Sequence, residues 1–135
     1  MFLLIACSTT LLLAQPGKDL IGLIVKGNDA DTVKIRKLFG LYHDNKLNEP
    51  QLALSAAECA ANIAVEKNLE LLHARALGYM GTVCYGMDRY PEALEHYLKA
   101  LQLYEKLDKK REQGVILNNM GNLFLDQELP DQALP

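Results

Sequence analysis

Histidine, cysteine and carboxylate side chains are the residues that could do catalytic or metal chemistry in this 135-residue chain. His43, His73 and His96 are far apart, and no His-x3-His or Cys-x2-Cys spacing occurs. Metal ligands and nucleophile–base pairs must meet at one point, and this spacing does not bring them together. No Gly-rich loop follows a strand, so no phosphate-binding loop is predicted. We therefore predict no catalytic residue, no metal site and no cofactor.

Asparagine amides are the one chemically distinctive group. Asn118 and Asn122 are four residues apart and share a face of a predicted helix, with Asn119 beside them. Asn is a poor helix former, so a cluster in mid-helix requires a reason. An amide can donate to and accept from a peptide backbone at once, so these residues could hold an extended peptide. The alternative is that Asn118 or Asn119 caps an inter-repeat loop.

The chain that positions these residues repeats itself at an interval of 40 residues. Two copies are easy to align and an earlier one is degenerate, which predicts a stacked array of units. The matching pairs are Leu77/Leu117, Met80/Met120, Gly81/Gly121, Ala93/Ala133 and Leu94/Leu134, while Ala53, Leu54 and Ala60 align with Ala93, Leu94 and Ala100.

Each unit has the pattern of two helices. In the middle unit, apolar residues spaced three to four apart over 72–87 predict an amphipathic helix, and those over 93–104 predict its partner. Residues 88–90 form the predicted turn. Pro91 suits the first helical position, where its missing N–H costs nothing.

Polar residues and prolines mark the predicted helix boundaries. Asn68 and Asp108 are candidate N-caps for the first helices of the second and third units. The first helix of the third unit is predicted to run to about Asp126. Pro130 should then open another helix, as Pro50 and Pro91 do in the earlier units.

Small residues at facing positions predict closely packed helices. Gly81 and Ala93 should lie on opposite helices of one hairpin and keep the axes 8–10 Å apart, while Ala100 should let the next hairpin stack. Gly121 recurs at the phase of Gly81, so we expect the same packing role. Three other glycines do not recur and are expected only to weaken their helices: Gly78, Gly86 and Gly114.

The spacing Leu77-x2-Met80-Gly81-x2-Cys84, then Ala93-x3-Tyr97-x2-Ala100, resembles the tetratricopeptide repeat. It recurs as Leu117-x2-Met120-Gly121-x2-Phe124, then Ala133. Leu77 and Leu117 replace the usual Trp, and Cys84 replaces Tyr. The resemblance implies an all-α, right-handed α-solenoid of stacked antiparallel helical hairpins, with about two and a half repeats. The 40-residue unit looks like the long-helix repeats in N-terminal parts of bacterial sensor kinases and regulators.

The predicted organisation has three parts. Residues 1–15 are a leader, and residues 16–30 are a linker with a short helix or, alternatively, a strand. The solenoid follows as a degenerate repeat over 31–67, a full repeat over 68–107 and an incomplete repeat over 108–135. Since the last helix would be cut short, we expect either a fragment of a longer protein or a partner that covers this end.

The leader is apolar, has no charged side chain before Lys18 and ends at Pro16-Gly17, as in a secretory signal peptide. We therefore expect an exported, periplasmic or envelope-associated protein. One alternative is a lipoprotein modified at Cys7, and another is an apolar N-terminal helix.

The first helices of stacked hairpins line the concave face, and this defines the expected groove. In the middle unit, Thr82 and Tyr85 lie on such a helix. The resemblance implies that residues at these positions of the first helices contact a ligand. The predicted groove residues are Asn118, Asn122, Thr82, Tyr85 and Leu125, with Arg75 near the mouth. Gly78 and Val115 occupy the basic positions of the carboxylate clamp of some relatives, which disfavours binding of acidic tails.

Composition excludes several classes of protein. The net charge of −3 leaves no basic excess for nucleic acid, and no apolar run is long enough for a transmembrane helix. Cys59 and Cys84 could pair only if the chain is exported. We predict a non-enzymatic scaffold that binds a protein or an extended peptide, in a larger bacterial signalling protein. The alternatives are a fragment of a sensor histidine kinase or cyclase and a self-associating envelope module.

Overall fold

The computed structural model describes residues 16–133, and this part of the chain is helical without strands. The predicted signal peptide, the lipoprotein alternative at Cys7 and the last two residues lie outside the described residues. The helices are α2 (Pro16–Lys26), α3 (Asp31–Asn45), α4 (Pro50–Glu66), α5 (Glu70–Gly86), α6 (Tyr90–Lys106) and α7 (Lys110–Ala133).

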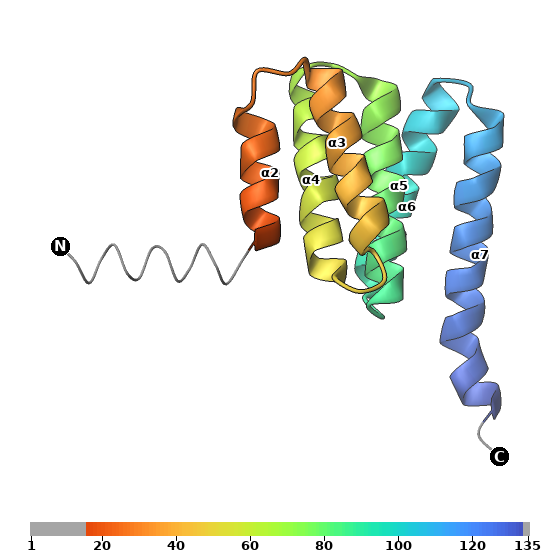
Figure 1. The fold of residues 1–135 in the computed structure, drawn as a ribbon. Helices are drawn as coiled ribbons and strands as arrows, with labels where there is room; N and C mark the ends of the chain where they lie inside the picture. The colour runs from red at the N-terminus through yellow and green to blue at the C-terminus, as the bar shows by residue number, and fades with distance from the viewer. Residues whose placement is uncertain (1–15, 134–135) are drawn as a thin grey trace.

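The helices stack in chain order, with α2 at one end of the row and α7 at the other (Figure 1). From α3 to α7, helices that follow one another in the chain pack on each other, which makes antiparallel hairpins. Four helices begin at 20-residue intervals, at Pro50, Glu70, Tyr90 and Lys110, so that two helices make one 40-residue unit. The prediction of an all-α solenoid of stacked helical hairpins is confirmed.

Helix α2 resolves the alternative left open for the N-terminal segment, because residues 16–26 are helical and the strand alternative is wrong. Gly17 lets α2 approach α4: a Cβ at this residue would lie 2.4 Å from Cδ2 of Leu52. Ile21 and Ile24 pack against the core. The Lys34 ammonium of α3 donates to the Val25 carbonyl at 2.9 Å.

The turns between α4 and α7 repeat one backbone geometry. Asn68, Asp88 and Asp108 have φ of 56°, 60° and 53°, in the left-handed region that short polar residues tolerate. In each turn the following N–H bonds back to a carbonyl five residues earlier, as in Leu69 N to Ala64 O at 2.8 Å. This is a Schellman closure of the preceding helix. The predicted N-cap roles of Asn68 and Asp108 are therefore wrong, since both residues end a helix rather than begin one.

The C-terminal helix is longer than predicted. Helix α7 runs without interruption to Ala133, so the expected end near Asp126 and the new helix at Pro130 are not found. The earlier turns place Asn or Asp at positions 68, 88 and 108, whereas the next place in this series holds Glu128. Glu lacks the short side chain that stabilises a left-handed residue, so the local signal to turn is absent.

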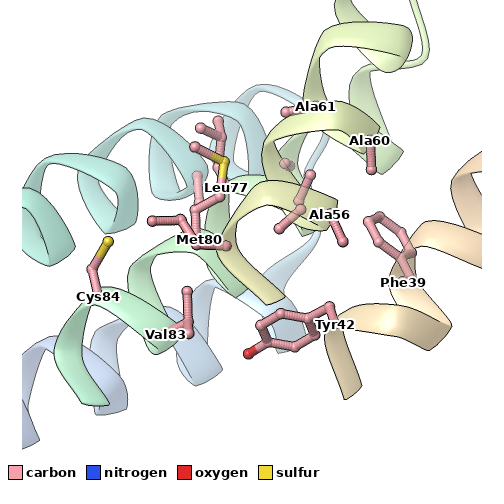
Figure 2. Packing of buried hydrophobic residues seen from close by; sticks show 14 of the residues in the cluster. Phe39, Tyr42, Ala56, Ala60, Ala61, Leu77, Met80, Val83 and Cys84 are labelled. Atoms are coloured by element: carbon pink, nitrogen blue, oxygen red, sulfur yellow. The ribbon is translucent and has the colours of Figure 1, made fainter. Parts of the chain in front are cut away.

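The core is built from small residues on α4 and larger ones on its neighbours. Alanines from α4 pack between the aromatic residues of α3 and the aliphatic residues of α5 (Figure 2). Small side chains at a helix contact allow the axes to come close. The fully buried alanines of α4 are Ala53, Ala56, Ala57, Ala60 and Ala64.

The residues of the repeat motif make close contacts in the middle unit, whereas the matching glycine of the last unit does not. Gly81 faces the ring of Tyr97, and a Cβ at Gly81 would lie 2.6 Å from Cδ1 of that ring. Ala93, Tyr97 and Ala100 are buried on α6. Gly121 has no neighbour within 4 Å of a built Cβ, so the packing role expected from its phase is not realised. The side chain of Ala133 lies outside the description.

Candidate functional site

A groove of about 320 Å³ opens between the first helices of three successive hairpins. Helices α3, α5 and α7 supply its walls, and α6 adds a single tyrosine. This is the concave side expected of stacked hairpins. The lining residues are Tyr42, His43, Lys46, Arg75, Gly78, Tyr79, Thr82, Tyr104, Glu112, Val115, Ile116 and Asn119.

Aromatic rings form one wall of the groove. Tyr42 and Tyr79 are stacked, with ring centroids 4.5 Å apart and an interplanar angle of 13°. Phe39 and His43 each meet Tyr79 edge-on, with centroid distances of 5.0 and 4.9 Å. Phe39 and Tyr42 are buried, so they hold the half-buried ring of Tyr79 in a fixed position, and a ligand can contact that ring at a low entropy cost.

Two cations stand at this groove. The Lys46 ammonium lies 5.9 Å from the centroid of the Tyr42 ring, within cation–π distance. Within residues 16–133, neither Lys46 nor Arg75 has a carboxylate oxygen within 4.0 Å, although five other cations do. Glu112 lines the opposite wall. The groove can therefore offer charge to a ligand without first breaking an internal ion pair.

The floor of the groove is made by α5. The Thr82 hydroxyl donates to the Gly78 carbonyl at 3.0 Å and accepts from the Tyr97 hydroxyl at 3.2 Å. Gly78 itself admits α7, because a Cβ there would lie 3.2 Å from Cδ1 of Ile116. Gly78 thus has a packing role beyond the helix weakening expected of it.

Burial shifts the pKa of three side chains that line the groove, Tyr42, Tyr104 and His43. Desolvation raises the pKa of Tyr42 and of Tyr104, and the charge of Arg75 opposes the rise at Tyr104. Desolvation together with the nearby Lys46 charge lowers the pKa of His43. Tyr hydroxyls and a neutral imidazole can each donate or accept, so they add polar contacts without fixed charge.

The comparison with known families matches residues 72–135 to a model described as Tetratricopeptide repeat. This part of the chain is a tetratricopeptide repeat. The chain matches none of the curated proteins and none of the solved structures with which it was compared. Tetratricopeptide repeats generally mediate protein–protein interaction and are non-catalytic scaffolds.

The groove between α3, α5 and α7 contains two of the six residues predicted for it, Arg75 and Thr82. The other four do not line it: Asn118, Asn122, Tyr85 and Leu125. Ile116 and Leu123 are buried and fix the rotation of α7. Because each residue turns the helix by about 100°, Asn118 and Leu125 fall on the side away from that core stripe. The amide that lines the groove is the neighbouring one, that of Asn119.

Tyr85 has a different task at the end of the array. Its hydroxyl donates to the Asp126 carboxylate and so joins the end of α5 to α7. This hydrogen bond is the main reason why the pKa of Tyr85 rises to about 12.

The residues of α3 were missed by the prediction of the groove. Tyr42, His43 and Lys46 come from the degenerate repeat, in which Leu41 or Tyr42 stands where the family has Gly. That departure was the available signal, because a large ring at a small-residue position must either separate two helices or project into a groove. Here it stacks on Tyr79.

The remaining reactive groups stay outside the groove. Cys59 and Cys84 are both free thiols, and burial raises the pKa of each, so neither is an activated nucleophile. In residues 16–133, no three His, Cys, Asp or Glu side chains gather as a metal site would require. None of the helices described is both long and apolar enough to span a membrane.

Proposed function

We propose that this protein is a scaffold whose groove between α3, α5 and α7 binds an extended peptide or a protein segment. The observation that carries the proposal is the composition of the groove. A stacked aromatic wall, two cations free of internal ion pairs and one amide converge on a single cavity. Tetratricopeptide repeats bind proteins, and this cavity offers both apolar and polar contacts to one.

The groove residues would divide the recognition between them. The half-buried ring of Tyr79, held in place by the buried Tyr42 stacked on it, would take an apolar side chain of the peptide. The Asn119 amide would pair with its backbone, since an amide donates and accepts together. Arg75 and Lys46 would attract a carbonyl or a carboxylate. This arrangement suits a segment that brings an apolar side chain, a backbone amide and a carbonyl or carboxylate to the groove together.

Selection from a random peptide library displayed on phage, with the 135-residue chain as the target, tests this function. We expect the selected peptides to bind the Asn119→Ala variant about fivefold more weakly than the unaltered protein, the loss of one hydrogen bond. Asn118→Ala is the matched control, because Asn118 is exposed and does not line the groove. Equal affinity for both variants and the parent would contradict the assignment of the groove.

We further propose that the scaffold is exported and is the N-terminal input segment of a larger bacterial signalling protein. The apolar leader supports export, and the resemblance of the 40-residue repeat to those before sensor kinases supports signalling. Fusion of residues 1–30 to alkaline phosphatase should give activity in the periplasm, whereas residues 16–30 behind a start codon should not. Inactivity of both fusions would refute export.

The signalling part of the proposal has its own test. Sequencing of the DNA that follows the codon for Pro135 should show an open frame that leads into a transmembrane helix and a catalytic domain. A stop codon at that point would refute the role as an input segment and leave peptide binding untouched.

A further inference from the structure

We propose that His43 and Lys46, at one end of the groove, bind an acidic side chain of the peptide, and that protonation of His43 strengthens this binding below neutral pH. The two residues are called the α3 basic pair. The inference rests on the proposed function and adds to it a charged group on the ligand and a dependence on pH. The sequence disfavoured acidic tails because Gly78 and Val115 carry no charge, whereas these basic groups come from α3.

The α3 basic pair lines the groove and is open to water. His43 lies in the last turn of α3 and Lys46 is its C-cap, and both residues are exposed. Residues three apart share one side of a helix. The His43 ring meets the Tyr42 and Tyr79 rings edge-on, with centroids 5.0 and 4.9 Å apart. These contacts hold the imidazole at the wall, where a proton and a ligand both reach it without opening the fold.

The α3 basic pair is free of internal ion pairs. Within residues 16–133, no carboxylate oxygen lies within 4.0 Å of the Lys46 ammonium or of the His43 ring nitrogens. Asp44 is the neighbour in sequence, but it does not line the groove, since consecutive residues lie on different faces of a helix. The charge of the pair is therefore directed to a ligand in the groove.

The opposite end of the groove is electrically balanced. Burial raises the pKa of Tyr104, while Arg75 lowers this pKa and Glu112 raises it, so charges of both signs lie near that hydroxyl. The charges that shift the pKa of His43 are those of Lys46 and Asp44, both from α3. An acidic side chain is therefore drawn to the α3 basic pair and away from Glu112.

The groove places few other titratable or charged groups around His43. They come from α3, α5, α6 and α7, and only Glu112 among them is acidic. These groups are Tyr42, Lys46, Arg75, Tyr79, Tyr104 and Glu112.

A bound carboxylate links peptide affinity to the protonation of His43. Burial and the Lys46 charge lower the pKa of His43 in the free protein. A ligand carboxylate close to the ring favours the protonated imidazole and so raises this pKa in the complex. The affinity should therefore rise as the pH falls through the pKa of the complex, and level off below the pKa of the free protein. Asp and Glu of the peptide stay mostly ionised above about pH 5, so the attraction persists in this range.

Selection from the random peptide library at pH 5.5, with the 135-residue chain as the target, supplies the probes. We expect the selected peptides to share an Asp or a Glu. Fluorescence anisotropy should show binding about fivefold tighter at pH 5.5 than at pH 7.5, the strength of one exposed ion pair. His43→Gln should bind equally at both pH values. His73→Gln is the matched control, because burial also lowers the pKa of His73 but this residue does not line the groove.

Two further changes separate the fixed charge from the titrating one. Lys46→Gln should weaken binding at pH 7.5 about threefold, the loss of one exposed charge pair. It should also move the pH dependence to higher pH, because Lys46 lowers the pKa of His43. Replacement of the shared Asp or Glu of the peptide by Asn or Gln should remove the pH dependence in the unaltered protein.

The outcomes distinguish this inference from the function on which it rests. Equal affinity at the two pH values would overturn the inference, as would a pH dependence that His43→Gln retains. Selected peptides without Asp or Glu would also overturn it. In each case, weaker binding to Asn119→Ala would leave the proposed function standing. Failure to select any peptide would refute both.

Discussion

Helices α5 and α7 hold matching positions of the repeat but differ in what surrounds them. Leu77, Gly81 and Cys84 of α5 are buried between α4 and α6. Their counterparts on α7, Leu117, Gly121 and Phe124, are exposed. A repeat motif therefore specifies which face of a helix is suited to packing. Whether that face is buried depends on a neighbour that the motif itself does not contain.

The largest expected difference between the two helices is in the leucine pair. Leu77→Ala should lower the free energy of unfolding by about 2–4 kcal/mol, because the side chain is 6% exposed and its loss leaves a cavity. Leu117→Ala should change it by less than about 0.5 kcal/mol. Urea unfolding at low micromolar concentration measures both. Equal losses would mean that α7 is covered in the monomer too.

The glycine pair should give effects of opposite sign. Gly81→Ala should destabilise the fold by about 1–3 kcal/mol, because the new methyl group meets the buried ring of Tyr97. Gly121→Ala should stabilise it by up to about 1 kcal/mol, because Ala is the better helix former and the site is open. Thermal unfolding of dilute samples measures the signs. Destabilisation by both changes would refute the contrast.

The smallest effect should come from the polar link between the two helices. The hydrogen bond to Asp126 raises the pKa of Tyr85 to about 12, so the bond stabilises the folded state at neutral pH and is lost as the pH rises through 10 to 12. NMR of ¹³C-labelled tyrosine, with the Tyr85 resonance assigned, should show this ring titrating near 12, and nearer 10 in Asp126→Asn.

Hydrogen exchange checks the same link at neutral pH. Tyr85→Phe should speed exchange of amides at the C-terminal end of α7. Tyr90→Phe is the control, because its hydroxyl donates to the carboxylate of Asp88, two residues earlier in the chain, at 3.1 Å. Identical exchange in both variants would show that Tyr85 does not hold α7.

Local periodicity allowed much of the fold to be predicted from the sequence. Apolar spacing located α5 and α6, and Pro50 and Pro91 marked the starts of α4 and α6. The roles of Asn68 and Asp108 were misassigned, because Asn and Asp are favoured both before a helix and in the left-handed residue after one. The end of α7 was misjudged for a related reason, since Pro130 lacks the preceding Asn or Asp of the other turns.

The groove was less predictable than the fold. The periodicity of α5 was enough to predict that Arg75 and Thr82 line the groove. The choice between Asn118 and Asn119 depends on the rotation of α7 about its axis, because neighbouring residues lie on different faces of a helix. That rotation is decided by Ile116, which enters the space left by Gly78. The contribution of Tyr42 depends on its stacking with a residue 37 positions away.

The sequence by itself determined the helical hairpins, their 40-residue period and the small residues that let them pack, because these depend on spacing along one helix. Tertiary structure decided which amide faces the groove, which ring stacks on Tyr79 and which face of α7 stays open. These features arise from contacts between helices. There the packing of a few side chains sets the rotation of each helix and the exposure of its residues, which the residue spacing within one helix does not encode.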